Sequence, residues 1–446
     1  MRVLFPVLTS LVLLHPAPVA SHAAAAGAAF RSPPLYGAAP AGQAAPALPA
    51  IHAVFGAPTT VATHAQLMGY GFAWGPSDGQ FGAIRADDGS YTFYGTAGSS
   101  SACAGTPNVE AAFTFTGTVD RVTGSNCKRL FGPGDGPAGW LFDRDYAGGG
   151  QIVRFASGGQ SGWLMPFHGE FWWSNSATSN HTCNGITCFY SSLGLAVSID
   201  DGKSFKVVGQ ILQPSQPLSV FTSGGTNMPV GYGSLVVADA NGQHLDNPPA
   251  DPSSAYFYLF YSDLLPGLPG ACATFDCLGV ARAPYAALVA SALSGDAHAV
   301  ATVFHKYDGA SPDPWAQPAT SDTPDESGTA GTYAPLWTDE VSYQPEVIFD
   351  STFNVYLAVY ESGASLSRFQ VRASRDLLHW SEPIGVPYSE AGRALYQPTL
   401  IGETGDPAIG GPAPRIYFTS WPTGGAFFNW SSSIFESLPL TLSAGP

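Results

Sequence analysis

The stretch Ser342–Trp380, SYQPEVIFDSTFNVYLAVYESGASLSRFQVRASRDLLHW, decides the fold of this chain. It contains three short runs, EVIFD, VYLAVYES and RFQVRAS, which are rich in the β-branched and aromatic residues that strands favour. Turn-forming pairs separate the runs, at Asp350–Ser351 and at Ser362–Gly363. The pattern predicts consecutive antiparallel strands, which make up most of a four-stranded blade of a β-propeller.

Similar groups of strand-like runs recur along the chain, in residues 69–120, 140–212, 228–307 and 396–440. Five such units predict an all-β protein, a five-bladed β-propeller of four-stranded antiparallel blades. In the third unit, we expect the last strand in His298–Tyr307, HAVATVFHKY. The first unit is one strand short. A C-terminal strand near Leu438–Leu442 is expected to complete it and to close the ring.

The composition suits many short strands joined by tight turns. The 446 residues include 52 glycines and 38 prolines, with 13% aromatic and only 11% charged residues. Two segments depart from the strand pattern: 286–293 is predicted to be a short helical turn, and 308–340 a long loop. Residues 51–446 are expected to form a single propeller domain.

The N-terminus has the features of a secretory signal. Arg2 precedes an apolar run, Val3–Leu14, and small residues suited to cleavage follow at Ser21–Ala26. We therefore predict a signal peptide over 1–25 and an Ala/Pro-rich leader over 26–50. The alternative is a membrane anchor, for which the run is short and interrupted by proline. Secretion to the extracellular space or periplasm follows, without membrane insertion.

The six cysteines fall into three pairs that are close in sequence. An even number of cysteines after a signal peptide favours disulfides, although six cysteines allow fifteen pairings in principle. A zinc site is the alternative, but the sequence contains no C-x-x-C, and no metal site is predicted. The expected pairs are Cys103 with Cys127, Cys183 with Cys188, and Cys272 with Cys277.

The net charge of −16 disfavours binding to nucleic acids, whose phosphates an acidic surface repels. No phosphate-binding loop, G-x-S-x-G nucleophile elbow or H-E-x-x-H zinc motif occurs. We expect no cofactor. The one exception that the acidic residues leave open is a bound Ca²⁺ ion, although no coordination spacing supports a Ca²⁺ site. The chain is expected to act as a monomer.

Two turns carry a family resemblance. Ser198–Phe205, SIDDGKSF, fits S-x-D-x-G-x-x-F, in which Asp accepts turn N–H groups, Gly adopts positive φ and Phe packs between sheets. It resembles the Asp-box of sialidases and related propellers. Ser374–Trp380, SRDLLHW, resembles the S-x-D-L-x-x-W turn of five-bladed glycoside hydrolases, the arabinanase/β-xylosidase and invertase/levansucrase group. The resemblance implies a fold rather than a reaction.

In the hydrolases that these turns resemble, three carboxylates from the inner strands of different blades converge on one glycosidic bond. In this chain, the carboxylates at the start of a predicted inner strand are Asp143 and Asp145 in the second unit and Glu346 in the fourth. By this resemblance, Asp143 or Asp145 is the base or nucleophile and Glu346 is the acid. Each has a structural alternative. The two aspartates could cap a turn or pair with Arg144, and Glu346 could be an ordinary buried acid.

Substrate-binding residues are expected in the segment PFHGEFWW. Aromatic faces stack on sugar rings while polar groups bind hydroxyls, which suits His168, Glu170, Trp172 and Trp173. Structural packing is the alternative for all four. Two units also open alike, with Tyr-Gln-Pro, so that Gln344 and Gln397 either bind sugar hydroxyls or mark a repeated turn.

These features together predict a secreted glycoside hydrolase of carbohydrate metabolism, which cleaves a poly- or oligosaccharide by carboxylate acid/base catalysis. The alternative is a non-catalytic carbohydrate-binding or cell-surface interaction propeller. A sialidase-like enzyme is a third option, which would need several arginines to meet in the centre. The candidates are Arg154, Arg282, Arg368 and Arg393.

Overall fold

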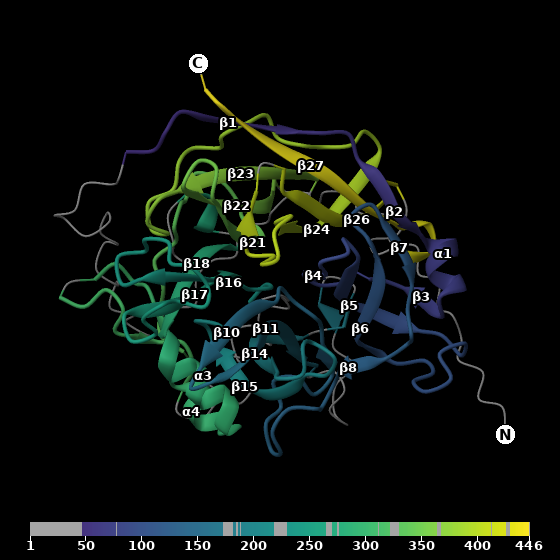
Figure 1. Ribbon diagram of the computed structural model, residues 1–446, viewed down its shortest axis with the longest axis horizontal. Helices are drawn as coiled ribbons and strands as arrows, with labels where there is room; N and C mark the ends of the chain where they lie inside the picture. The colour runs from purple at the N-terminus through teal and green to yellow at the C-terminus, as the bar shows by residue number, and fades with distance from the viewer. Residues whose placement is uncertain are drawn as a thin grey trace, which may run out of the picture.

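The computed structural model describes residues 47–445, except for 77, 173–181, 184–185, 188, 218–229, 265–269, 274–275, 311, 322–329, 364–366, 412 and 425–428. Five mainly antiparallel sheets are arranged around a central axis (Figure 1). The predicted five-bladed β-propeller is therefore confirmed. The predicted signal peptide and most of the leader lie outside the described residues.

Blades 1 to 3 follow one another along the chain. The strands of blade 1 are β3 (Phe72–Trp74), β4 (Gly82–Arg85), β5 (Tyr91–Ser99), β6 (Glu110–Thr118), β7 (Arg121–Gly124) and β8 (Arg129–Phe131). Those of blade 2 are β9 (Tyr146–Ala147), β10 (Val153–Ser157), β11 (Gln160–Phe171), β14 (Tyr190–Ser198) and β15 (Lys206–Leu212). Blade 3 contains β16 (Ser234–Asp239), β17 (Ala255–Asp263), β18 (Cys277–Pro284), β19 (His305–Lys306) and β20 (Gln317–Pro318). A small hairpin, β12 (Thr182–Cys183) with β13 (Ile186–Thr187), follows β11.

Blades 4 and 5 complete the ring. Blade 4 contains β21 (Tyr343–Asp350), β22 (Val355–Ser362), β23 (Arg368–Ser374) and the short parallel strand β25 (Ile409–Gly410). Blade 5 contains β24 (Arg393–Ile401), β26 (Arg415–Pro422), β27 (Ile434–Ala444), β1 (Ile51–Phe55) and β2 (Thr59–Thr63). The helices are α1 (His64–Gly69), α3 (Tyr285–Ser294) and α4 (Ala297–Ala301), with short 3-10 turns η2 (Gly270–Ala273) and η3 (Trp430–Ser432). No helix in the described part of the chain is long and apolar enough to cross a membrane.

The ring closes through the N-terminal strands. Both β1 and β2 pair antiparallel with β27, the third strand of blade 5, and so cover its outer edge (Figure 1). The prediction that a C-terminal strand near Leu438–Leu442 completes the first blade is therefore wrong. Blade 1 supplies its own outer strands, β7 and β8, whereas β27 leaves an open edge that the N-terminus satisfies.

The third blade also departs from the prediction. Only His305–Lys306 of the expected strand His298–Tyr307 is a strand, and α4 takes its first residues. The side chain of Asp296 caps this helix, since it accepts hydrogen bonds from the backbone N–H groups of His298 and Ala299 at 3.0 and 3.2 Å. The helical turn predicted over 286–293 is confirmed as α3.

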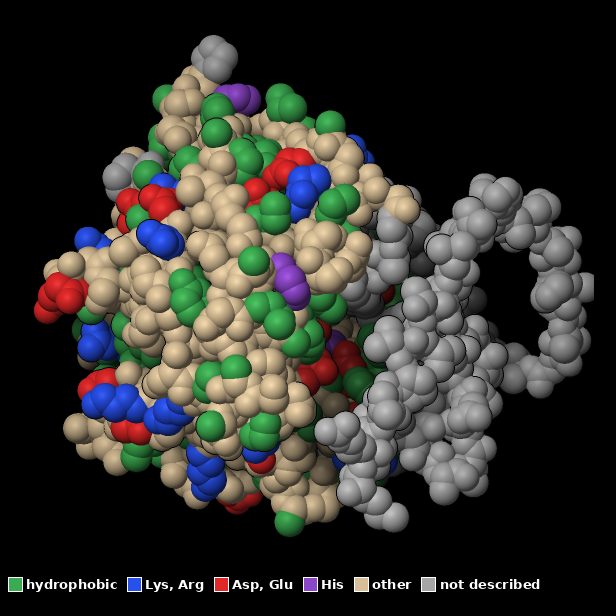
Figure 2. Space-filling view, turned by 90° about the vertical axis from the view of Figure 1, so that its right-hand side faces the viewer, with side chains coloured by type: hydrophobic (Ala, Val, Ile, Leu, Met, Phe, Trp, Pro, Cys, Tyr) green, Lys and Arg blue, Asp and Glu red, His purple; other side chains and the backbone are tan. Residues whose placement is uncertain are grey.

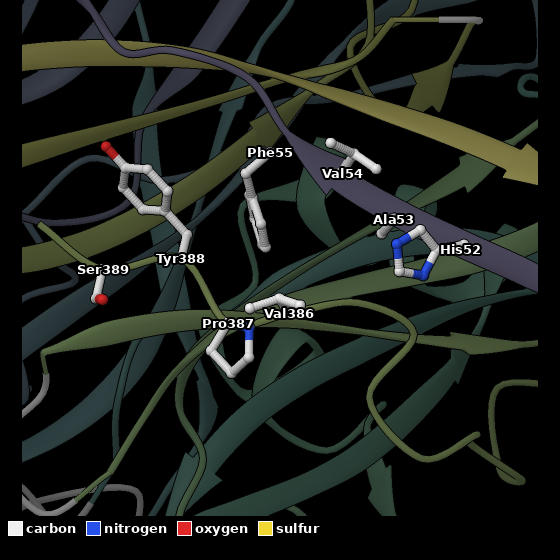
Figure 3. A pocket seen from close by; sticks show the side chains of 8 residues that line it. All are labelled: His52, Ala53, Val54, Phe55, Val386, Pro387, Tyr388 and Ser389. Carbon is white, nitrogen blue, oxygen red and sulfur yellow. The ribbon is translucent and has the colours of Figure 1, made fainter.

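In blade 4, an irregular segment takes the place of an outer strand. The backbone N–H groups of Ile384 and Tyr388 donate to carbonyls of β23 at 2.9 and 3.0 Å. This segment also reaches β1, because the N–H of Ala53 donates to the carbonyl of Ile384 at 2.8 Å. Between β1 and residues 386–389 lies a surface pocket of about 270 Å³ (Figure 3). It is on the outer rim of the ring, away from the axis.

Hydrophobic contacts hold neighbouring blades together. Buried apolar side chains form five clusters in the described chain, one at each junction between adjacent blades. The two Asp turns contribute to these junctions. Phe205 of the Asp-box is buried against Tyr94 of blade 1, with ring centroids 5.8 Å apart. Trp380 packs edge-on against Phe260 of blade 3 at 5.9 Å. The aromatic side chain of each turn thus packs between its own blade and the preceding blade.

Polar side chains fill the axis itself. We call Gln80, Gln151, Ser234, Gln397 and Thr399 the axial belt. All five are buried, and each bonds to the backbone of an inner strand, or of the segment just before one, in another blade. Gln151 of blade 2, for example, accepts from the N–H of Leu235 in blade 3 at 2.7 Å and donates to the carbonyl of Val347 in blade 4 at 3.3 Å. The belt satisfies inner-edge backbone groups that have no further strand to pair with.

Removing one member of the axial belt should destabilise the whole ring. Gln151→Ala leaves the N–H of Leu235 and the carbonyl of Val347 without this partner, at a cost of about 1–3 kcal/mol for each buried group. We expect the free energy of unfolding, measured by urea denaturation, to fall by roughly 2–5 kcal/mol. The control is Gln160→Ala, at an exposed position of β11. Equally small losses in both variants would contradict a role for the belt.

Candidate active site

The candidate site lies on one face of the ring. We count the strands of each blade outward from the axis, and neighbouring strands run in opposite directions. The starts of the first and third strands and the ends of the second strands therefore lie on this face. We call it the site face. Glu170 and Glu361 lie at the ends of β11 and β22, Glu110 starts β6, and Asp78 and Tyr232 precede the inner strands β4 and β16.

Three carboxylates on the site face act on one another electrostatically. We call Asp78, Glu110 and Glu170 the acid cluster. Asp78 and Glu110 are partly exposed to solvent, whereas Glu170 is only 9% exposed. The negative charge of Glu170 raises the pKa of both other carboxyls, and Glu110 also acts on Asp78. The three groups, from blades 1 and 2, therefore share one site.

Glu170 is held by two hydrogen-bonding neighbours from its own strand end. One oxygen lies 3.0 Å from Nε2 of His168, and the other accepts a hydrogen bond from the indole N–H of Trp172. The predicted grouping of His168, Glu170 and Trp172 is thus present in the structure, whereas Trp173 lies outside the described residues.

Tyrosines from three blades surround the acid cluster. The hydroxyl of Tyr396 donates to a carboxylate oxygen of Asp78 at 3.4 Å, and the hydroxyl of Tyr146 donates to the backbone carbonyl of the same residue. The hydroxyls of Tyr146 and Tyr232 are 3.3 Å apart. The ring of Tyr232 also packs on His168, with centroids 4.4 Å apart. These contacts fix the two sides of the cluster relative to each other.

The cluster retains a proton near neutral pH. Burial, followed by the charge of Glu170, raises the pKa of Glu110 to about 7. Burial is also the main reason that the pKa of Asp78 lies well above its ordinary value; the charges of Glu110 and Glu170 add to this effect, and the hydrogen bond from Tyr396 opposes it. Burial and the neighbouring negative charges both favour the neutral form, so the cluster holds a proton near neutral pH.

The repeated Tyr-Gln-Pro segments form matching β-bulges at the start of two inner strands. Gln344 and Gln397 have positive φ angles of 50° and 56°, and strand pairing skips one residue within Tyr343–Glu346 and Tyr396–Thr399. The backbone N–H of Gln397 donates to the carboxylate of Glu361 in the neighbouring blade. Its side chain belongs to the axial belt. The buried side-chain amide of Gln344 has no hydrogen-bond partner among the described residues.

Aromatic rings extend from the acid cluster towards the junction of blades 5 and 1. Tyr396, which contacts Asp78, packs on Trp421 with centroids 5.4 Å apart, and Trp421 packs on Trp430 at 5.9 Å. Trp430 in turn stacks on Trp74 of blade 1 at 5.2 Å. We call Trp74, Trp421 and Trp430 the tryptophan track. Trp74 and Trp430 are half-buried, so part of the track reaches solvent.

Asp143 and Asp145 have structural contacts close to the site. Asp143 is buried in the loop before blade 2 and accepts from the N–H of Gly136 at 2.8 Å, and burial raises its pKa to about 6. Asp145 pairs with Arg144 at 2.7 Å and accepts from the N–H of Trp172 at 2.7 Å. It therefore ties this loop to the end of β11, beside Glu170.

Glu346 lies in β21 next to the axial belt. It is fully buried, which raises its pKa well above the ordinary value, and the neighbouring Gln151 opposes this shift. No member of the acid cluster is among the groups that shift its pKa. Asp143, Asp145 and Glu346 are the catalytic residues predicted from the sequence. Their roles stay predictions.

The sequence reasoning missed Asp78, Glu110 and Glu361. Asp78 follows a Gly-Pro pair in an irregular loop, where no strand pattern marks it. Glu110 begins the run EAAFTFTGT, which is strand-like in sequence, but no local signal marks it as a third strand that starts on the site face. Strand order was the usable signal. Acids at second-strand ends and third-strand starts would have pointed to Glu110, Glu170 and Glu361.

Two of the three predicted disulfides are confirmed, Cys103–Cys127 and Cys272–Cys277. Cys103 lies between the second and third strands of blade 1, and the other pair lies between those of blade 3. Both therefore brace loops on the site face. Of the third predicted pair, Cys183 with Cys188, Cys188 lies outside the described residues. Within the described chain, no group of three His, Cys, Asp or Glu side chains is placed to hold a metal ion.

The arginines of a sialidase-like site do not gather in the described structure. Arg154 lies over Trp163, with its guanidinium 5.6 Å from the ring centroid. Arg393 pairs with Glu390 at 3.4 Å, and Arg282 lies at the other end of blade 3.

The chain matches no protein-family model and no curated protein. Several solved structures are similar to it. One is the catalytic domain of a Coprinopsis cinerea GH62 α-L-arabinofuranosidase, with 11% identity over 88% of this chain and 98% of that one, at a TM-score of 0.45. A Podospora anserina α-L-arabinofuranosidase solved with cellotriose gives the same values. A GH130 structure, described in connection with β-1,2 mannosidic linkages in Candida mannan, has 11% identity over 86% of this chain and 94% of that one, at 0.42. These structures are described as glycoside hydrolases, but at these scores no residue role is taken from them.

The buried carboxyl of Glu361 should make stability depend on pH. Burial raises its pKa to about 8, against 4.5 when unfolded. Between these values the folded state holds a proton that the unfolded state has released, so stability falls as pH rises from about 4.5 to 8. Glu361→Gln removes this contribution. We expect the melting temperature of the variant, relative to wild type, to rise progressively from pH 5 to pH 8.5. A difference that does not change with pH would contradict the raised pKa.

Proposed function

We propose that this protein is a secreted glycoside hydrolase that cleaves a poly- or oligosaccharide at the acid cluster. The observation that carries the proposal is that burial and the nearby charge of Glu170 raise the pKa of Asp78 and Glu110, so that Glu110 keeps its proton near neutral pH beside a second carboxylate. Hydrolysis of a glycosidic bond needs this combination, because one group must protonate the leaving oxygen while another stabilises or attacks the anomeric carbon.

In the proposed mechanism, Glu110 is the general acid. Its carboxyl is partly exposed and titrates near neutrality, so it can donate a proton to the glycosidic oxygen as the C–O bond breaks. Glu170 acts on the other side of the bond, either by accepting a proton from the attacking water or by attacking the anomeric carbon. Asp78 lies on the same side of the cluster, where burial and then the charges of Glu110 and Glu170 raise its pKa, so it is a second carboxyl that can hold a proton.

Sugar binding is proposed for the groups around the acid cluster. The side-chain amide of Gln344 can bind a hydroxyl group, and His168 orients Glu170. Trp172, Trp74 and Trp430, which are half-buried, offer aromatic surface for the apolar faces of sugar rings. Gln397 is assigned a structural role, because its side chain and backbone are both used within the protein.

The proposed secretion is supported by the chemistry of the chain. Disulfides form and persist outside the reducing cytosol, and two are present among the described residues. The signal peptide over 1–25, the leader and a single domain over 51–446 remain part of this proposal. On the side of the molecule that Figure 2 shows, basic and acidic side chains are interspersed, so no continuous basic surface for nucleic acid forms there.

Amide substitutions in the acid cluster test the mechanism. Glu110→Gln and Glu170→Gln each remove a proton donor or acceptor with little change of shape. We expect either to lower the rate of glycan cleavage by about 10²–10⁴-fold. The assay is reducing-sugar release from a panel of plant and microbial polysaccharides, at pH 5 to 8. Activity of wild type should fall as pH rises through about 7, because Glu110 then loses its proton.

The matched controls are Asp143→Asn, Asp145→Asn and Glu346→Gln, the acids predicted from the sequence. We expect each to keep activity within about tenfold of wild type, as their carboxyls lie outside the cluster. Loss of cleavage in these variants, with activity retained in Glu110→Gln and Glu170→Gln, would overturn the assignment. Glycan binding without cleavage by wild type would favour a non-catalytic carbohydrate-binding protein.

A further inference from the structure

A second pocket lies at the opposite end of blade 3 from the acid cluster. It has a volume of about 400 Å³ and is lined by Tyr256, Arg282, Pro284, His305, Asp313, Trp315 and Ala316. Tyr256 and Pro284 pair at the end of the blade where β17 starts and β18 finishes. Asp263, at the other end of β17 on the site face, is seven residues further along, or roughly 23 Å at 3.3 Å per residue. The two sites are therefore separate.

A guanidinium group that packs against two aromatic rings lines this pocket. Arg282 lies 4.2 Å from the ring centroid of Trp315 and 4.7 Å from that of Tyr256. One of its nitrogens donates to the carbonyl of Ala240 at 3.0 Å, which fixes the orientation of the fork. None of the ion pairs in the described chain includes Arg282. A rigid arginine without an acidic partner, in a chain with a net charge of −16, is suited to bind a carboxylate.

The other polar groups of the pocket narrow the choice of ligand. Asp313 and His305 are exposed on its rim. The carboxylate of Asp313 repels a compact dianion such as phosphate, but it accepts hydrogen bonds from hydroxyl groups. A ligand that satisfies both Arg282 and Asp313 carries one carboxylate and several hydroxyls on a small ring. The volume lies within the range of small-molecule sites.

We infer that this pocket is an accessory binding site for a uronic acid unit of an acidic polysaccharide. The sugar carboxylate pairs with Arg282, and its hydroxyls contact Asp313 and His305. Such a site binds the polysaccharide on the face away from the acid cluster and raises the local concentration of polysaccharide near the protein. Its binding does not depend on cleavage. The inference therefore stands or falls separately from the proposed hydrolase activity.

Titration calorimetry with the full-length secreted protein tests the site. The probes are an oligogalacturonate trimer, a neutral cello-oligosaccharide of the same length, sodium acetate and inorganic phosphate. We expect the acidic trimer to bind and Arg282→Gln to weaken this binding at least about tenfold, the scale of a charge-assisted hydrogen bond. Arg282→Lys should recover only part of the affinity, because lysine lacks the bidentate fork.

Three controls make the outcome clear. Arg121→Gln removes an exposed arginine of blade 1 and should leave binding of the trimer unchanged. Glu170→Gln, which should lower the rate of cleavage by about 10²–10⁴-fold, should leave binding of the trimer unchanged as well. His305→Ala alters only the rim of the pocket and should weaken binding of the trimer moderately. This variant tests the site even if the Arg282 variants fold poorly. Equal binding of the neutral oligosaccharide, tighter binding of phosphate, or full affinity in Arg282→Gln would overturn the inference.

Discussion

The whole structure depends on how five sheets meet at one axis. Each inner strand has an edge with no further strand to pair with, so its backbone groups need other hydrogen-bond partners. The axial belt solves this problem, since amides and hydroxyls from one blade bond to the backbone of another. Hydrophobic clusters hold the blades side by side, but the belt sets their relative height. Residues just above it, such as Asp78 and Gln344, are placed accurately as a consequence.

The candidate site uses this rigidity to keep like charges together. Isolated in water, Asp78, Glu110 and Glu170 would all be ionised at neutral pH. Burial and mutual repulsion prevent this, and tyrosine hydroxyls and His168 hold the groups in place. Gathering these carboxyls costs folding free energy, and the stability of the surrounding ring offsets this cost. Perturbed acids of this kind gather at catalytic sites more often than at purely structural ones.

The sequence predicted the fold better than the site. Strand runs and the two Asp turns identified the five blades because β-branched and aromatic residues alternate with clear turn signals, as in Ser342–Trp380. The closure of the ring was predicted wrongly, because the N-terminal strand β1 pairs with β27 in blade 5 and no C-terminal strand completes blade 1. No local sequence pattern shows which terminus covers the edge of β27. Glu170 and His168 were recognised beside tryptophans. Asp78 was missed because it lies in an irregular loop, and its importance arises only when blades 1, 2 and 5 meet.

Burial, reinforced by the charge of the nearby Glu170, keeps Glu110 protonated up to about pH 7. NMR titration of the Glu110 carboxyl carbon, in wild type and in Glu170→Gln, measures this directly. The account predicts a midpoint near pH 7 in wild type and a clearly lower midpoint in the variant, where the like charge is gone. A midpoint near the ordinary glutamate value of about 4.3 in both proteins would contradict it.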